Sequence, residues 1–230
     1  MSHFAVAVFH NEDQSVDELL APYDEGIKYA PYLKFSKQDA INYVREKYRE
    51  MLDKNDDDCW NLIASWYIPD RKGNLYSTSN PNAKWDWWVI GGRWSNLLKL
   101  KNGVFADSAR VRDIDFTPNR KLYKNALRFW DIFVEHKPLE KDEEMPFSLH
   151  NEDYYRAFYK NRDTYARRQA QFSTFAVISA NGIWEEKAES GWFGMSNETP
   201  QEAENWEDNF FDNFIKGNDD LFLTIVDCHI

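Results

Sequence analysis

Apolar residues along the chain recur with two different periods, which predict two kinds of element. Continuous apolar runs at 4–9 and 221–230 predict buried strands. Apolar residues spaced by three or four positions predict amphipathic helices. These helices cover residues 36–52, 53–67, 117–134, 151–171 and 199–217. The last of them begins with Thr199, Pro200 and Glu202, a combination typical of a capped helix N-terminus.

Two Asn-Gly pairs predict β-hairpins in the middle and in the last third of the chain. Asn102-Gly103 lies between short segments at 97–101 and 104–106, and Asn181-Gly182 lies between 175–180 and 183–186. An Asn-Gly pair favours a type I′ turn, in which both residues have positive φ. Residues 68–84 are polar and rich in turn-forming residues, so we expect a long irregular loop of the kind that often lines a site.

The order of these elements predicts an α+β fold. Strands are expected at both ends and in the centre, with helices between them in irregular order. This order favours a mainly antiparallel sheet that contains both terminal strands and is packed by several amphipathic helices. No internal repeat or low-complexity linker divides the chain. We therefore expect a single domain over 1–230, in which 112–170 can also be interpreted as a helical insertion.

Charge adds a second feature at the C-terminal end. The chain has 28 Lys and Arg against 39 Asp and Glu, a net charge of −11. Residues 185–230 carry −10 of it, because they hold 12 acidic and only 2 basic side chains. On the predicted helix at 199–217, the acidic side chains off the apolar stripe are Glu204, Glu207, Asp208 and Asp212. They form either an ordinary solvated helix face or an anionic surface that binds a host protein with a basic surface.

Composition excludes several classes of protein. The 10 Trp, 12 Tyr and 16 Phe provide too much apolar surface for a disordered chain. Cys59 and Cys228 are too far apart for a zinc knuckle and too few for a disulfide framework. No run of about 18 apolar residues is present, so we expect no membrane partner and a cytoplasmic protein. The acidic net charge opposes direct general binding of DNA.

The most unusual segment is 80–94, which reads Asn-Pro-Asn-Ala-Lys-Trp-Asp-Trp-Trp-Val-Ile-Gly-Gly-Arg-Trp. In a regular strand, Asp86 would lie on the face opposite Trp87. Gly91-Gly92 would permit a bulge or a close backbone approach, and Arg93 could pair with Asp86. This arrangement is either an internal buttress among core tryptophans or a pocket for a planar or anionic ligand, such as a nucleotide.

The closing Asp227-Cys228-His229 is the best candidate for chemistry. Asp227 and His229 are two positions apart on a predicted strand, so they point the same way and could present a carboxylate and an imidazole to a metal or a substrate. The alternative is a strand end that simply reaches solvent. His10 would join them if the terminal strands are neighbours. The predicted ligand-binding residues are Asp86, Trp87, Arg93, Trp94, His10 and His229.

No established catalytic motif occurs in the chain. The dinucleotide-binding, P-loop, zincin and nucleophile-elbow patterns are all missing their minimum residues. We therefore predict no cofactor and no metal ligands, and we assign no catalytic residue.

Four stretches together resemble an uncharacterised protein family. They are the 80–94 segment, Phe-Ser-Thr-Phe-Ala-Val at 172–177, Gly-Trp-Phe-Gly-Met-Ser at 191–196 and Val-Asp-Cys-His-Ile at 226–230. The members of this family are hypothetical proteins of bacterial phages, prophages and mobile elements. The resemblance implies a mobile-element setting but no activity, and it does not extend to 112–170.

Two hypotheses of function follow. The first is a phage or mobile-element interaction protein that acts as an acidic antagonist, similar to an anti-CRISPR inhibitor, of a host nucleic-acid-targeting or nucleotide-signalling defence system. The second is a nucleotide-binding protein or metal-dependent hydrolase with a pocket around Asp86, Arg93 and His229. The sequence leaves open whether the protein is an enzyme.

Overall fold

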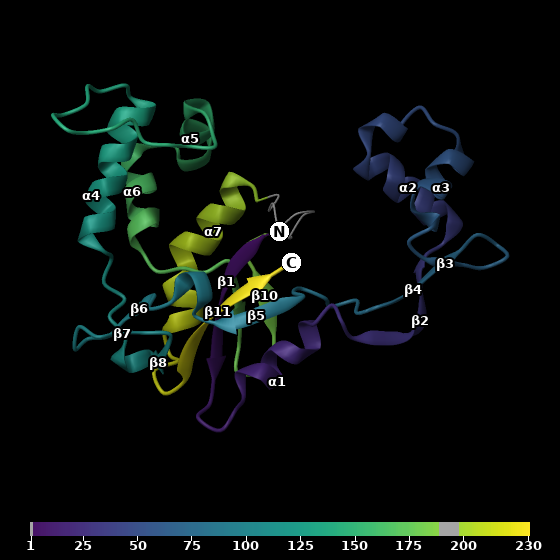
Figure 1. Ribbon diagram of the computed structural model, residues 1–230, viewed down its shortest axis with the longest axis horizontal. Coiled ribbons are helices and arrows are strands. Elements are labelled where there is room, and N and C mark those ends of the chain that lie inside the picture. Colours follow the sequence, from purple (N-terminus) through teal and green to yellow (C-terminus); the bar gives the residue numbers. More distant parts are fainter. Residues whose placement is uncertain (1, 189–197) are drawn as a thin grey trace. The chain divides into compact units, whose positions relative to one another are not determined.

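The computed structural model describes residues 2–188 and 198–230, and its contacts divide the chain into two compact units. The first unit holds the chain up to Pro22 and from Trp85 onward, and the second holds Tyr23–Lys84. Each unit has its own sheet, helices and buried core (Figure 1). The α+β fold class is confirmed, while the single domain stays a prediction. The predicted family motif at 191–196 lies outside the described residues.

A six-stranded sheet organises the first unit. Its order is β10-β9-β1-β11-β5, and β8 also pairs with β11. All of these pairs are antiparallel except β1 with β9. The strands are β1 (His3–His10), β5 (Trp87–Ile90), β8 (Ser108–Arg110), β9 (Ala176–Ile178), β10 (Trp184–Glu186) and β11 (Phe222–His229). Both terminal strands lie in the sheet, as predicted.

The two terminal strands pair along their whole length. His3 lies opposite His229, and His10 lies opposite Phe222. Next to the His3–His229 pair, the backbone groups of Ser2 and Ile230 exchange hydrogen bonds of 3.3 and 3.1 Å. The start of the first strand and the end of the last strand therefore share one end of the sheet, where the chain ends are labelled in Figure 1.

Alternation along β1 and β11 gives the sheet two buried faces. Phe9 and Ile225 belong to the core cluster that also contains Phe210 and Phe214. These two phenylalanines come from α7 (Pro200–Phe210) and the π-helical turn η7 (Phe211–Ile215) that continues it. α7 begins with the predicted capping box of Thr199 and Glu202. The even-numbered residues of the two strands, such as Val6, are buried on the other face.

Short elements complete this unit around the sheet. α1 (Val16–Leu20), which the sequence did not predict, is followed by a 3-10 turn η1 (Ala21–Tyr23). The first predicted hairpin is formed by β6 (Leu98–Lys99) and β7 (Phe105–Ala106), and the second by β9 and β10. Only the glycine of each Asn-Gly pair has positive φ, 86° at Gly103 and 76° at Gly182, so neither turn is of type I′.

A group of helices spans residues 120–170. It contains α4 (Arg120–Phe129), the π-helical turn η5 (Trp130–Val134), α5 (Glu152–Tyr159) and α6 (Arg162–Ala170) (Figure 1). One helix was predicted over 151–171, but two form, because Lys160 has a φ of 64° and Asn161 caps a new helix through the Thr164 amide. Aromatic side chains around Trp130 and Tyr165 fill the space between these helices.

The second unit packs two helices and a small sheet. The helices are α2 (Lys37–Lys47) and α3 (Asp56–Ala64), with a 3-10 turn η2 (Arg49–Met51) between them. The sheet has the order β2-β4-β3, with β2 (Lys28–Phe35), β3 (Ile68–Pro69) and β4 (Leu75–Ser79). The expectation of an irregular loop over 68–84 is therefore wrong for these two strands. They form because Leu75 is fully buried in the core beside Ile41 and Ile63.

No helix in the described parts of the chain is long and apolar enough to span a membrane.

Candidate functional site

Two histidines from opposite ends of the chain meet at the end of the β1–β11 ladder. His3 and His229 are cross-strand partners, so their side chains leave the sheet on the same face. Their ring centroids are 5.0 Å apart in an edge-to-face arrangement. The side chains are 16% and 14% exposed. Each ring is therefore held by its neighbours while part of it remains accessible to a ligand.

A carboxylate orients each imidazole. Nδ1 of His3 lies 2.8 Å from Oδ1 of Asp227, and Nδ1 of His229 lies 2.6 Å from Oδ1 of Asp86. A carboxylate can only accept a hydrogen bond, so Nδ1 is the protonated nitrogen in both rings. Neither Nε2 atom has a hydrogen-bond partner among the residues that the structure describes. Nε2 is therefore the nitrogen that can bind a ligand or exchange a proton.

The turn after β5 holds one of these carboxylates in place. Asp227 is 2% exposed in its side chain, and its Oδ2 accepts the backbone N–H of Arg93 at 2.9 Å. Arg93 belongs to the 3-10 turn η3 (Gly92–Trp94), in which Gly92 has a φ of 53°. A Cβ at Gly92 would lie 2.4 Å from Oδ2 of Asp227. The close backbone approach predicted at Gly91-Gly92 is confirmed, since only glycine leaves room for the carboxylate.

Trp87 provides an aromatic surface beside the two imidazoles. It lies opposite His229 in the β5–β11 pair. Its ring centroid is 5.8 Å from that of His3 and 6.4 Å from that of His229. The residue is 49% exposed. Arg93 is also exposed, and its guanidinium has no ion pair among the described residues. The site thus combines two oriented imidazoles and an accessible indole with Arg93, whose backbone N–H bonds to Asp227.

His10 does not belong to this site. It is seven residues from His3 along β1, which corresponds to about 23 Å. Its Nε2 is 2.9 Å from Oγ1 of Thr224, and its Nδ1 is 2.9 Å from the carbonyl oxygen of Asn11. The expectation that His10 would join Asp227 and His229 is wrong. The terminal strands are neighbours, but they are antiparallel, so the start of β1 and not its end meets the end of β11.

Two further expectations for the 80–94 segment are corrected. Asp86 bonds to His229 and not to Arg93. β5 begins only at Trp87, so the regular alternation that separates Asp86 from the Trp87 face does not extend to Asp86. Trp94 is half-buried and packs against the main core, and its predicted role in ligand binding stays a prediction. Trp85 is buried, and its indole N–H donates to the carbonyl oxygen of Leu20 at 3.1 Å.

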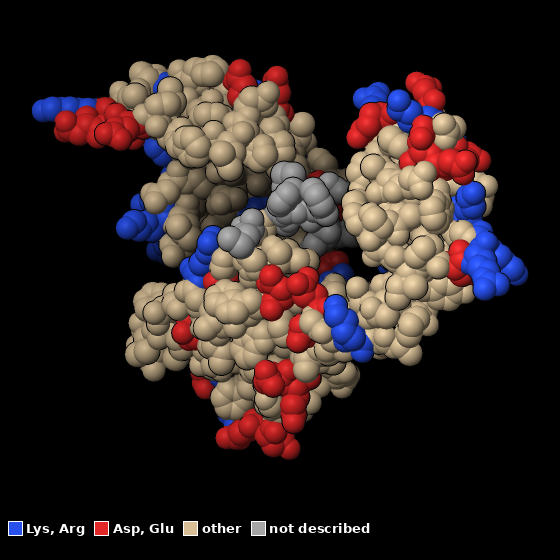
Figure 2. Space-filling view, turned by 45° about the vertical axis from the view of Figure 1, so that its right-hand side comes forward, with Lys and Arg blue, Asp and Glu red and all other residues tan. Residues whose placement is uncertain are grey.

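The four acidic residues predicted to bind a partner, Glu204, Glu207, Asp208 and Asp212, are all engaged in ion pairs. Several of the partners are Lys160, Arg167 and Arg168, which lie within the range 151–171 predicted as one helix. The pairs include Glu204 with Lys160, Glu207 with Lys187, Asp208 with Arg167 and with Arg168, and Asp212 with Lys216. On the face in view in Figure 2, acidic and basic side chains lie in small groups. The excess negative charge of this segment is therefore partly neutralised within the protein itself.

The histidine site is not a ready-made metal site. In the ranges 2–188 and 198–230, no three His, Cys, Asp or Glu side chains are arranged so as to hold a metal ion. Both Nδ1 atoms are already hydrogen-bonded to the two carboxylates of the site. The metal-dependent version of the hydrolase hypothesis thus gains no support from this geometry.

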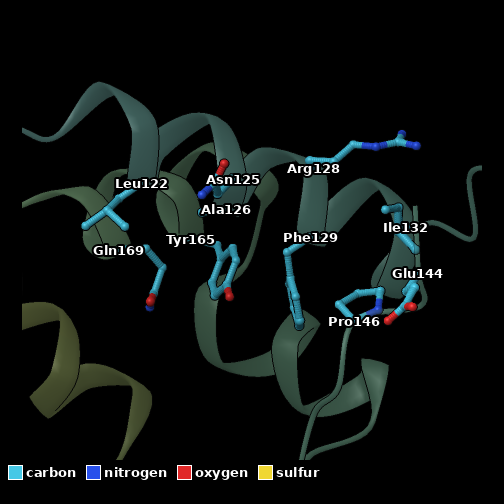
Figure 3. A pocket seen from close by; sticks show the side chains of 10 residues that line it. All are labelled: Leu122, Asn125, Ala126, Arg128, Phe129, Ile132, Glu144, Pro146, Tyr165 and Gln169. Carbon is cyan, nitrogen blue, oxygen red and sulfur yellow. The ribbon is translucent and has the colours of Figure 1, made fainter. Parts of the chain in front are cut away.

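A surface pocket of about 460 Å³ lies among the helices of 120–170. Figure 3 shows Phe129 and Tyr165 side by side in it, with their ring centroids 5.4 Å apart, while Arg128 extends away from Tyr165. The Arg128 guanidinium pairs with Glu143, which leaves a mostly apolar lining. None of the residues predicted to bind a ligand lies in this pocket.

Sequence reasoning placed Asp86, Trp87, Arg93 and His229 correctly in one region but missed His3. The missing residue could have been found from strand direction. If the two terminal strands pair antiparallel, the position opposite His229 must lie near residue 3, and His3 is the only chemically active side chain there. The sequence alone did not reveal whether those strands run parallel or antiparallel.

Comparisons of the chain with protein-family models, with curated proteins and with solved structures find no match. The interpretation of the site therefore rests on its own geometry, which is that of two carboxylate-oriented histidines joined across the terminal strands.

Proposed function

We propose that the chain binds a nucleotide through its phosphate group at the end of the β1–β11 ladder. The observation that supports this proposal is the pairing of His3 and His229, each with Nδ1 bonded to a carboxylate and with ring centroids 5.0 Å apart. Two imidazoles at this separation can, in their doubly protonated form, donate from Nε2 to different oxygens of one phosphate group, because each hydrogen bond spans about 2.7–3.2 Å.

The charge around the site suits an anion. A carboxylate on Nδ1 orients each imidazole and leaves its Nε2 available to the ligand. The backbone N–H of Arg93 donates a hydrogen bond to Asp227. The exposed guanidinium of Arg93 has no ion pair within the described residues. A planar guanidinium can bind phosphate oxygens in a bidentate manner. These groups together favour a phosphate monoester or diester over a neutral ligand.

Trp87 supports the choice of a nucleotide over inorganic phosphate. Its indole is half-exposed and lies at the edge of both imidazoles. A large exposed aromatic side chain beside an anion site offers a surface on which a base can stack. Stacking of this kind contributes about 1–3 kcal/mol per base.

The acidic-antagonist hypothesis has less physical support than the nucleotide site. It depends on an anionic surface formed by Glu204, Glu207, Asp208 and Asp212. Each of these side chains has a basic partner within the chain. A surface that has to release its own ion pairs before it binds a basic partner is a poor mimic of a phosphate backbone.

The proposal predicts that adenosine 5′-monophosphate binds and that single substitutions in the site weaken it. Arg93→Ala and His229→Ala are each expected to raise the Kd of this nucleotide about tenfold, because each removes a charged hydrogen bond. Adenosine without phosphate is expected to bind at least tenfold more weakly than the nucleotide. Isothermal titration calorimetry with purified protein measures all of these values.

His136→Ala is the matched control. His136 also has a carboxylate partner, Glu152 at 2.7 Å, but it is exposed and lies on the helical part of the first unit. Its substitution should leave the Kd unchanged. If millimolar adenosine 5′-monophosphate produces neither heat nor an increase in the melting temperature of the native protein, the proposed function is wrong.

A further inference from the structure

Within 2–188 and 198–230, the site supplies two groups that can transfer protons but no side-chain nucleophile. His3 and His229 each present Nε2, while both of their carboxylates are bonded to Nδ1. Cys228 lies between Asp227 and His229 in the chain but points to the opposite face and is fully buried. Burial raises the pKa of its thiol well above the ordinary value, so it stays protonated and unreactive. A reaction at this site therefore takes its nucleophile from solvent or from the substrate itself.

A ribonucleotide phosphodiester can supply its own nucleophile, because its 2′-hydroxyl lies next to the phosphorus atom. We propose that the paired histidines cleave single-stranded RNA by general acid–base catalysis. This inference rests on the proposed nucleotide site and adds the substrate class and the reaction.

The reaction uses only the two imidazoles of the site and the 2′-hydroxyl and phosphate of the substrate. One neutral imidazole accepts the proton of the 2′-hydroxyl at its Nε2, and the 2′-oxygen forms a bond to phosphorus. The bond between phosphorus and the 5′-oxygen breaks, and the other imidazole, protonated at Nε2, donates its proton to that oxygen. The products are a 2′,3′-cyclic phosphate and a 5′-hydroxyl. No water, metal ion or redox partner is consumed, and exchange with solvent restores the two protonation states.

The arrangement of the two imidazoles fits the separate roles of general base and general acid. In an in-line displacement the attacking and leaving oxygens lie on opposite sides of phosphorus, so two separate proton-transfer groups are needed. The two rings come from different strands and meet edge-to-face at 5.0 Å, so they present different edges to one phosphate. Asp227 and Asp86 hold the rings in the required tautomer and act as positioning residues.

The surroundings favour a short, single-stranded substrate. Trp87 is half-exposed and can stack one unpaired base, and Arg93 can stabilise the charge that develops on the phosphate. The net charge of −11 opposes binding of a long polyanion. A dinucleotide is therefore the appropriate probe.

The test uses the full chain, the dinucleotide uridylyl-3′,5′-adenosine and a buffer that contains EDTA. The native protein is expected to release adenosine and uridine 2′,3′-cyclic phosphate, and the 2′-deoxy analogue is expected to stay intact. His3→Ala and His229→Ala should each lower the rate at least 100-fold, whereas His136→Ala should leave it unchanged. All variants are purified identically, so a contaminating nuclease would appear equally in each of them.

A substrate with sulfur in place of the bridging 5′-oxygen separates the two roles. A thiolate leaves without a proton, so this substrate should restore the rate of the variant that lacks the acid and not of the variant that lacks the base. Asp86→Asn is expected to lower kcat and leave KM unchanged, because the imidazole of His229 stays in place but loses the carboxylate that orients it.

Three results would overturn the inference. They are cleavage that requires a divalent cation, restoration of both or neither histidine variant by the thio substrate, and absence of cleavage by protein that binds adenosine 5′-monophosphate. The last result would contradict the proposed cleavage but not the proposed nucleotide site. Absence of binding to this nucleotide would remove the proposed function and the inference together.

Discussion

Asp208→Ala is expected to lower the free energy of unfolding by about 3 kcal/mol, because it leaves a buried guanidinium without its main partner. Nε of Arg168 lies 3.2 Å from Oδ1 of Asp208, and the Arg168 side chain is only 2% exposed. Asp208 also accepts hydrogen bonds of 3.0 and 3.1 Å from Arg167. Urea denaturation followed by circular dichroism measures the loss.

Asp212→Ala is the control for this substitution. Asp212 lies in η7, and its pair with Lys216 is 3.2 Å long with both side chains more than 60% exposed. An exposed pair contributes little, so we expect a change within about 0.5 kcal/mol. Equal losses in the two variants would contradict the view that the buried contact between α6 and α7 is the important one.

The contribution of Asp208 also depends on pH. Burial raises the pKa of Asp208, but the hydrogen bonds from Arg167 and Arg168 outweigh burial and hold the pKa below its ordinary value of 3.8. A carboxyl group with a lowered pKa in the folded state stabilises the fold above its ordinary pKa and loses this effect as pH falls through the lowered value. The difference in stability between native protein and Asp208→Ala should therefore be constant from pH 7 to about pH 5 and shrink below pH 4.

Gly92→Ala is expected to lower the free energy of unfolding by about 2–5 kcal/mol and to abolish binding of adenosine 5′-monophosphate. A side chain at a φ of 53° is strained, and the new Cβ would lie 2.4 Å from Oδ2 and 2.5 Å from Cβ of Asp227. Asp227 has to move, and its bonds to His3 and to the Arg93 amide are lost with that movement. Denaturation and calorimetric titration measure the two effects.

Gly103→Ala separates backbone strain from the clash. Gly103 has a φ of 86°, but a Cβ there would meet nothing within 4 Å. Its substitution should cost only the strain of about 1–2 kcal/mol and leave nucleotide binding unchanged. If Gly92→Ala resembles Gly103→Ala in both measurements, the turn η3 does not position Asp227 in the way described.

The chain's local patterns predicted most of its elements. Ser36, Asn55 and Thr199 cap the helices that the apolar spacing indicates, because capping and amphipathicity are properties of neighbouring residues. The two Asn-Gly hairpins and both terminal strands are likewise present. The strands at Ile68–Pro69 and Leu75–Ser79 were missed because their segment is polar and its single anchor, Leu75, is buried by residues distant in sequence.

In the candidate site too, the sequence identified an unusual local segment but not its contacts with residues distant in the chain. Asp86, Trp87 and Arg93 lie in one short segment of the chain, and the two glycines before Arg93 indicate a close backbone approach, so the sequence identifies this segment as unusual. The partner of each residue is not local. Asp86 bonds to a residue 143 positions away, and Asp227 bonds to one 224 positions away.

Strand direction was decisive for the histidines. Continuous apolar runs predicted that the first and last segments are buried strands, with His10 at the end of the first and His229 near the end of the last. Side-chain alternation is identical in parallel and antiparallel pairs, so it carries no information on direction. The antiparallel register of β1 with β11 selects His3 over His10 as the neighbour of His229. The ion pairs of α7 have the same origin, because the packing of α6 against α7, and not the charge of either helix, brings Arg168 to Asp208.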